Sequence, residues 1–270
     1  MENWPVINMH AHVYPDELAE RAVRSLAELY PIPVQCDGTL DGLREDGRKA
    51  GISRFVLCSP AIKPENVQGI NSFIAQCCRE SPDCIGFGTL HPWTQHLDFE
   101  LDYLKHLGLK GVKLHPDGQR FRLDSPAAER MFALIEKSGL PVLLHMGAAG
   151  ADTGLSDPAS VRALALRHPE MMIIAAHMGG LFAWEDAPEQ LTGLPNVCFD
   201  MSSVMPMVTE EQFLHAVRTV GTDRIFFGTD YPLWKSDDAM RRFRALPLTE
   251  PEQRDILYRN FRHLILKEDV

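Results

Sequence analysis

The stretch Trp4-Pro-Val-Ile-Asn-Met-His-Ala-His-Val13 carries two histidines separated by one residue, next to a short apolar run. That run predicts a β-strand, in which side chains two residues apart point to the same side. His10 and His12 therefore share a face, and neutral imidazole nitrogen suits zinc and other borderline metals. The pair alone also fits histidines that are merely half-buried, so its meaning depends on partners elsewhere in the chain.

Apolar runs alternate with amphipathic stretches eight times along the 270 residues. The predicted strands are 6–10, 54–58, 85–90, 111–115, 141–145, 171–177, 197–201 and 224–230. Helical periodicity predicts helices at 40–50, 65–80, 96–107, 126–138, 157–167, 181–191, 209–220 and 237–245, with a ninth at 250–266. Several strands are continuous hydrophobic blocks, as expected for parallel strands covered on both faces.

This alternation favours an α/β fold, a single (β/α)8 TIM barrel over 1–270 with an extra C-terminal helix. A doubly wound open sheet is the competing fold. The polar residues at the strand ends favour the barrel, because they meet at its mouth but would be strung along the edge of an open sheet. These residues are His10 and His12, Ser59, His91, His115, His145, His177, Ser202 and Ser203, and Asp230.

The longest stretch expected to be irregular is 13–38, which contains Tyr14-Pro15 and Pro31-Ile-Pro33. An insertion of this kind beside the mouth of a barrel is a candidate lid or specificity loop. No linker, repeat or low-complexity segment indicates a domain boundary.

Composition narrows the class of protein. The formal net charge is −10 and no basic patch stands out, which argues against nucleic acid as a partner. No apolar run approaches the roughly 20 residues that span a bilayer. The six cysteines show no CxxC spacing and are expected to be reduced thiols. Without a recognisable signal peptide, the expected location is cytoplasmic, the expected partner is a small-molecule substrate, and a homo-oligomer is possible.

Six motifs together resemble the amidohydrolase superfamily, in particular the branch that includes aminocarboxymuconate semialdehyde decarboxylase and related lactonases and hydratases. The resemblance covers nearly the whole chain. The motifs are Asn8-Met-His-Ala-His12, Gly111-Val-Lys-Leu-His-Pro116, Leu144-His145-Met-Gly147, Ala176-His177-Met-Gly-Gly180, Phe227-Gly-Thr-Asp-Tyr-Pro232 and Asn260-Phe-Arg-His-Leu264.

The resemblance implies a metal site built from His10, His12, His145 and Asp230. His177 would be the nearby imidazole that polarises the substrate or moves protons, and Asp230 would also be the general base. One divalent metal is expected, with zinc favoured and manganese, iron and cobalt as alternatives. Three imidazoles and a carboxylate leave room for a water or a substrate, which a metal can activate.

Four further residues are expected to line the substrate site: His115, Lys113, His91 and Trp234. Lys113 shares the inward face of its strand with His115, and an inward lysine is uncommon. In some branches of the superfamily a lysine on this strand is carbamylated and bridges two metals; the Gly-x-Lys-Leu-His-Pro form here favours the single-metal branch. Trp184 could wall the pocket as well as Trp234.

Three functions remain open at this stage. The favoured one is a metal-dependent hydrolase of a small ester, lactone or amide. The alternative is a non-oxidative decarboxylase or hydratase of a small unsaturated carboxylic acid, and the third is a non-catalytic small-molecule-binding barrel. A decarboxylase would be expected to clamp carboxylates with arginines near the mouth. The available arginines are Arg44, Arg48, Arg120, Arg122, Arg241 and Arg242, and no motif fixes any of them at a strand end.

Overall fold

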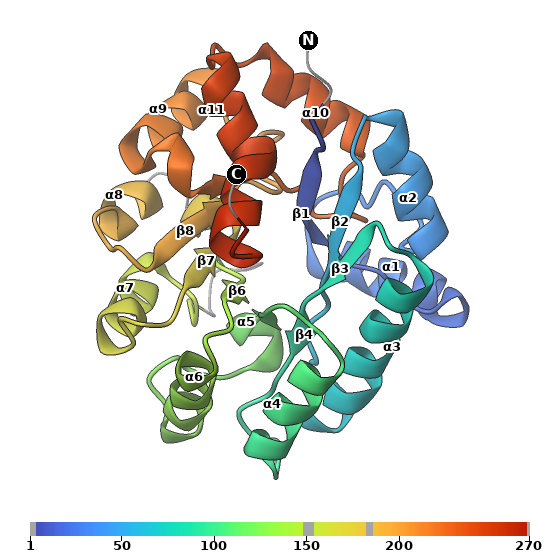
Figure 1. The fold of residues 1–270 in the computed structure, drawn as a ribbon, viewed down its shortest axis with the longest axis vertical. Helices are drawn as coiled ribbons and strands as arrows, with labels where there is room; N and C mark the ends of the chain where they lie inside the picture. Colours follow the sequence, from blue (N-terminus) through green and yellow to red (C-terminus); the bar gives the residue numbers. More distant parts are fainter. Residues whose placement is uncertain (1–3, 148–153, 182–185, 269–270) are drawn as a thin grey trace.

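The computed structural model describes residues 4–147, 154–181 and 186–268, which form a ring of parallel strands surrounded by helices (Figure 1). The strands are β1 (Ile7–Ala11), β2 (Arg54–Leu57), β3 (Cys84–Gly86), β4 (Gly88–Thr89), β5 (Val112–Leu114), β6 (Val142–Leu144), β7 (Ile173–Ala175), β8 (Val197–Asp200) and β9 (Ile225–Phe226). Only Phe87 separates β3 from β4, so these two pieces fill the place of one predicted strand.

Parallel pairing runs in chain order from β1 to β3 and from β4 to β9. The ring closes between the first and last strands. The amide of Met9 donates to the carbonyl of Phe227 at 2.8 Å, the amide of Asp230 donates to the carbonyl of His10 at 3.0 Å, and Ala11 bridges to Tyr231. This closure confirms the predicted barrel and excludes the open sheet.

Helices cover the outside of the ring (Figure 1). They are α1 (Asp16–Leu29), α2 (Leu40–Lys49), α3 (Val67–Glu80), α4 (Leu97–His106), α5 (Pro116–Gln119), α6 (Pro126–Ser138), α7 (Pro158–Arg167), α8 (Ala187–Leu191), α9 (Glu210–Val220), α10 (Ser236–Ala245) and α11 (Glu250–Arg254). The last helix continues in wider turns, Asp255–Arg259 and Phe261–Ile265. Of the predicted helix 181–191, the structure describes α8 and not 182–185, so Trp184 lies outside the described residues.

One expectation is wrong. The stretch 13–38 is not irregular throughout, because it contains the 14-residue helix α1. Neither glycine nor proline interrupts Asp16–Leu29, and its apolar residues recur at helical spacing. Only Ala19 of this helix is fully buried. Most of this helix is exposed, and the prolines on either side suggest an irregular stretch when only the sequence is considered.

Alternating strand residues divide between two cores. Side chains such as Ile7, Met9, Val56 and Cys58 form one cluster, while their neighbours along the strands pack with the outer helices. Phe261 and Ile265 from the C-terminal segment join the first cluster. This inner cluster therefore fills the barrel, and the C-terminal segment lies over the centre of the ring in the view of Figure 1.

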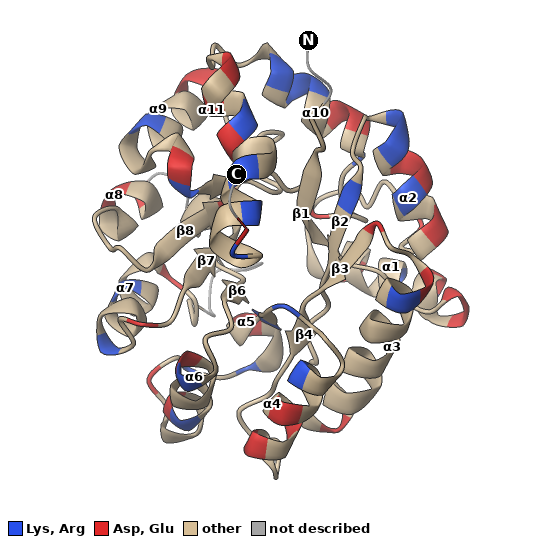
Figure 2. Cartoon of the chain, viewed as in Figure 1, with Lys and Arg blue, Asp and Glu red and all other residues tan. Residues whose placement is uncertain are grey.

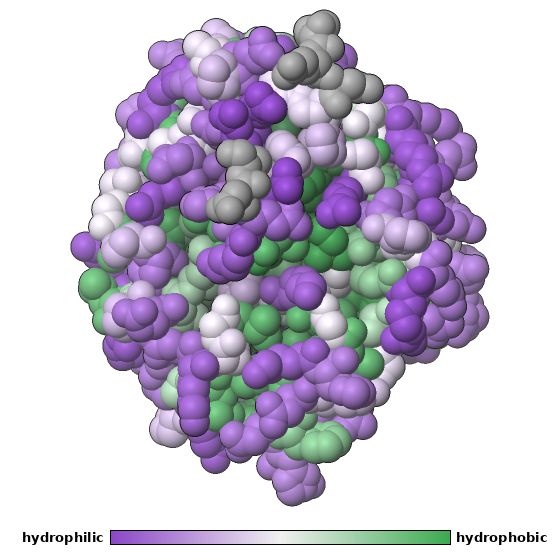
Figure 3. Space-filling model, in the orientation of Figure 1, coloured by the Kyte–Doolittle hydropathy of each residue, from purple (hydrophilic) through white to green (hydrophobic). Residues whose placement is uncertain are grey.

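Charged residues lie mainly on the outer helices and their connections, with both signs intermixed (Figure 2). Hydrophilic residues accordingly cover much of the face seen in Figure 3, with apolar atoms visible between them. Among the described helices, none is both long and apolar enough to span a membrane.

Candidate metal and proton-transfer site

The candidate site lies where the strands end. His10 belongs to β1, and His145, His177 and Asp230 follow β6, β7 and β9. His177 and Asp230 have φ values of 59° and 61°, a left-handed conformation that is uncommon for residues other than glycine. Such backbone geometry tends to occur at functional sites, where the surrounding structure holds it in place.

His10 and His12 are oriented by their Nδ1 atoms. His10 Nδ1 lies 2.6 Å from a carboxylate oxygen of Asp200, and His12 Nδ1 lies 2.6 Å from the backbone carbonyl oxygen of Cys58. Because a carbonyl and a carboxylate only accept, both Nδ1 atoms carry the proton. In the neutral rings the Nε2 atoms are therefore lone-pair donors, and they lie 3.1 Å apart.

Asp230 supplies a third donor atom at the same point. Its Oδ1 lies 3.5 Å from His10 Nε2 and 3.3 Å from His12 Nε2. Donors bonded to one metal at about 2.1 Å are separated by about 3.0–3.4 Å in octahedral or tetrahedral arrangements. The three converging atoms therefore have separations that fit a divalent metal.

The pKa values of His10, His12 and Asp230 are shifted by burial and by the groups that surround them. Burial and the neighbouring Lys113 lower the pKa of His10 to about 4. Burial also acts to lower the pKa of His12, but Cys58 and Asp230 outweigh it and raise that pKa to about 9. Burial acts to raise the pKa of Asp230, yet His10 and His12 hold it well below its usual value. Without a metal, a proton on His12 thus faces the Asp230 carboxylate.

Asp200 is a functional residue that the motifs did not single out. Besides holding His10, its Oδ2 accepts from Ser202 Oγ at 2.6 Å, and that hydroxyl lies 3.1 Å from His177 Nδ1. One potential metal-ligand atom from each of His10, His177 and Asp200 also lies within 4.8 Å of the other two. A hydrogen bond joins Asp200 to His10, and the Ser202 hydroxyl contacts both Asp200 and His177, so we regard Asp200 as a carboxylate that orients His10. Its inward register, two residues after Cys198 of the inner cluster, could have identified it.

Asp230 is held through its second oxygen. Ser203 Oγ donates to Asp230 Oδ2 at 2.5 Å, and Trp234 Nε1 donates to Ser203 Oγ at 3.0 Å. Trp234, predicted to contact substrate, thus has a structural contact that supports the carboxylate. Gly228 leaves the space for Asp200, since a Cβ there would lie 2.3 Å from Asp200 Oδ1.

His145 pairs with His177 in this structure. His145 Nε2 lies 2.8 Å from the Gly147 carbonyl and His177 Nδ1 lies 3.0 Å from the Ser202 carbonyl, so both atoms donate. The two remaining nitrogens, His145 Nδ1 and His177 Nε2, face each other at 3.1 Å. A hydrogen bond between them needs one additional proton. Burial lowers the pKa of both imidazoles, so the pair would hold that proton weakly.

The other predicted substrate residues differ in position. Lys113 is fully buried, with Nζ 3.1 Å from His10 Nε2, and burial lowers its pKa. His115 stacks on His145 with ring centroids 3.7 Å apart, and its Nε2 donates to the hydroxyl of Tyr30 at 2.9 Å. Tyr30 follows α1, so the insertion does reach the site. His91 is buried against Trp93.

Changing Asp200 tests its orienting role. We expect Asp200→Asn to weaken metal binding by about 10–100-fold, because the amide no longer stabilises the Nδ1 proton of His10 as an anion does. Isothermal titration of the metal-free protein with zinc or manganese measures the change. An affinity equal to that of the wild-type protein would show that Asp200 does not support the site.

Comparisons with solved structures show the same fold. An uncharacterized TIM-barrel protein from Bordetella bronchiseptica is 18% identical, with a TM-score of 0.80 over 98% of this chain and 99% of that chain. 5-Carboxyvanillate decarboxylase LigW from Sphingomonas paucimobilis is 17% identical, with a TM-score of 0.76 over 97% and 99%. Dihydroxybenzoic acid decarboxylase from Polaromonas sp. JS666, with bound manganese and the inhibitor 2-nitroresorcinol, is 18% identical, with a TM-score of 0.75 over 98% of each chain.

No curated protein matches the sequence significantly. The amidohydrolase family profile does match, over residues 7–264. That range contains all six motifs and every candidate ligand. The protein therefore belongs to the amidohydrolase family, as its motifs predict.

Proposed function

We propose that the protein is a metal-dependent, non-oxidative decarboxylase of a small hydroxylated aromatic acid. The convergence of His10 Nε2, His12 Nε2 and Asp230 Oδ1 carries the proposal. The sequence favours hydrolysis, but similar solved structures with a stated activity are decarboxylases, and one of them holds manganese. This likeness supports decarboxylation, the alternative function that the sequence left open.

Decarboxylation replaces a carboxyl group by hydrogen on the same carbon, so the site must tolerate negative charge and deliver a proton. A divalent metal would supply Lewis-acid stabilisation of that charge. We assign the proton to the His145–His177 pair, which needs one extra proton to form its hydrogen bond. Asp230, fixed by Ser203, lies near this pair, with His177 Nδ1 3.9 Å from Asp230 Oδ2, and we assign to it the role of general base towards the substrate.

An arginine clamp is not part of this proposal, because most of the available arginines are already paired. Arg44 and Arg48 contact Asp83, which precedes β3 at the opposite end of the barrel, and Arg241 and Arg242 contact Asp238. The ammonium of Lys113 is the buried cation beside the ligand atoms, and we assign the substrate carboxylate to it and to the metal.

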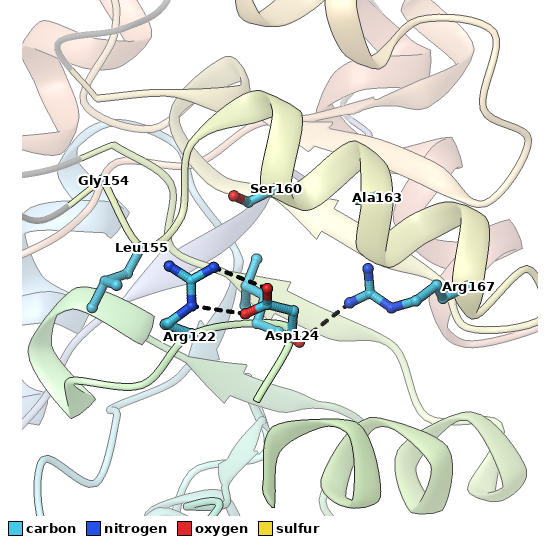
Figure 4. Close-up of a pocket in the computed structure, with 8 residues that line it drawn as sticks. Arg122, Asp124, Gly154, Leu155, Ser160, Ala163 and Arg167 are labelled. Carbon is cyan, nitrogen blue, oxygen red and sulfur yellow. Dashed lines mark hydrogen bonds and ion pairs between the residues drawn. The ribbon is translucent and has the colours of Figure 1, made fainter. Parts of the chain in front are cut away.

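A separate cavity of about 110 Å³ lies between the segments that follow β5 and β6 (Figure 4), and its arginines are paired as well. There Arg122 donates to both carboxylate oxygens of Asp124 at 2.9 Å, and Arg167 donates to Glu129 at 2.7 Å. These guanidinium groups are occupied by protein carboxylates. This cavity therefore offers no free cation pair for a substrate.

The test uses metal-free and metal-reloaded protein with 2,6-dihydroxybenzoate and 5-carboxyvanillate. We expect loss of carbon dioxide from at least one acid, abolished by removal of the metal and restored by manganese or zinc. In deuterium oxide, NMR should show one deuterium on the carbon that lost the carboxyl group. A panel of lactones, esters and amides is the control. Turnover confined to that panel would establish hydrolysis instead, and full activity without metal would refute both readings.

A further inference from the structure

Cys58 lies directly beside the proposed ligand atoms. It follows β2, is fully buried and belongs to the cluster that fills the barrel. Its Sγ and one ring nitrogen from each of His10 and His12 lie within 4.8 Å of one another. Its backbone carbonyl also accepts from His12 Nδ1 at 2.6 Å, so the backbone of Cys58 and the imidazole of His12 are held together.

A thiolate at Cys58 would add a negative charge beside the metal, in a site where burial makes an unbalanced positive charge costly.

We propose that Cys58 is a further ligand of the metal and that its sulfur directs the site towards zinc or cobalt rather than manganese. This inference rests on the proposed metal site. On binding, the thiol S–H bond breaks, its proton passes to water, and the sulfur lone pair forms the bond to the metal. Thiolate sulfur favours zinc, whereas manganese prefers oxygen donors.

Ligation requires the side chain of Cys58 to move towards the metal. A zinc–sulfur bond of about 2.3 Å and a zinc–nitrogen bond of about 2.1 Å place sulfur and nitrogen about 3.6 Å apart in a tetrahedral site. At present Cys58 Sγ and one ring nitrogen each of His10 and His12 are separated by at most 4.8 Å. The sulfur therefore has to approach the ring nitrogens when the metal binds.

Cobalt gives a direct readout, because thiolate–cobalt bonds absorb in the near ultraviolet by charge transfer. We expect this band in the cobalt-loaded wild-type protein and its loss in Cys58→Ser. Cys198→Ala is the matched control, since Cys198 is another buried thiol of the same cluster, and it should keep the band. In competition titrations, Cys58→Ser should lower the preference for zinc over manganese by about tenfold or more.

The outcomes separate this inference from the proposed function. Wild-type protein that binds cobalt without the charge-transfer band overturns Cys58 ligation and leaves the metal site intact. Failure to bind any of the three metals overturns the metal site itself. If Cys58→Ser does not fold, X-ray absorption of the zinc-loaded wild-type protein decides the question. A sulfur neighbour at about 2.3 Å supports ligation, and a first shell of nitrogen and oxygen alone contradicts it.

Discussion

Asp230→Asn is expected to lower turnover by about a hundredfold or more while the metal stays bound. Asparagine keeps an oxygen that can face His10 and His12, but it carries no negative charge and cannot take up a proton. In the wild-type protein the carboxylate is held ionised, since His10 and His12 keep its pKa well below the usual value despite burial. Turnover of the best acid substrate and metal content of the same preparation are measured together.

Asp223→Asn is the control, because Asp223 is an exposed aspartate between α9 and β9, outside the site, and its change should leave turnover unchanged. Wild-type turnover in Asp230→Asn would refute proton transfer by this carboxylate. Joint loss of metal and turnover would show that Asp230 is needed to hold the metal, and would not separate that role from proton transfer.

His12→Ala is expected to have the second large effect, a loss of metal affinity greater than the 10–100-fold typical of residues that only orient a ligand. The substitution removes one of three converging donor atoms and leaves Asp230 facing His10 alone. Metal content after dialysis, measured by atomic emission, reports the loss. A variant that keeps full metal content would refute the ligand assignment. The same measurement on His145→Ala tests whether His145 is the fourth ligand, as the sequence predicts.

The pH dependence of metal binding gives an independent check on His12. Its pKa of about 9 means that the metal-free protein holds a proton there at pH 7, and the metal must displace it. Apparent affinity should therefore rise by about tenfold per pH unit from pH 7 towards pH 9 and then level off. Titrations in buffers with different ionisation enthalpies should show at least one proton released at pH 7. In His12→Ala the part of this rise that is due to the His12 proton should be lost.

Much of the barrel could be predicted, because each strand is a short apolar block and each strand end carries a polar residue. His10 and His12 can be identified from the two-residue period of a strand, and Asp230 from its place at the end of the last apolar run. These predictions depend only on the local pattern of apolar and polar residues. The mouth of the barrel then follows from topology.

Other parts of the site depend on which residues the packing brings together. The register of β8 turns Asp200 inward, but only the closed barrel shows that its partner is His10, 190 positions away in the sequence. The pairing of His145 with His177 depends on ring orientations set by two carbonyl groups. Helix α1 buries only one residue fully, and the prolines that flank it suggest irregular structure, although its apolar residues recur at helical spacing.

The closure between β1 and β9 has a consequence for how the protein forms. His10 and Asp230 stand near opposite ends of the chain, and they meet only where the last strand docks against the first. A bound metal would act as a cross-link between those strands. It would oppose their separation by closing a loop of some two hundred residues. During synthesis the nascent chain would have no complete binding centre until its last strand emerged. Metal uptake would therefore be a late event that locks a finished ring.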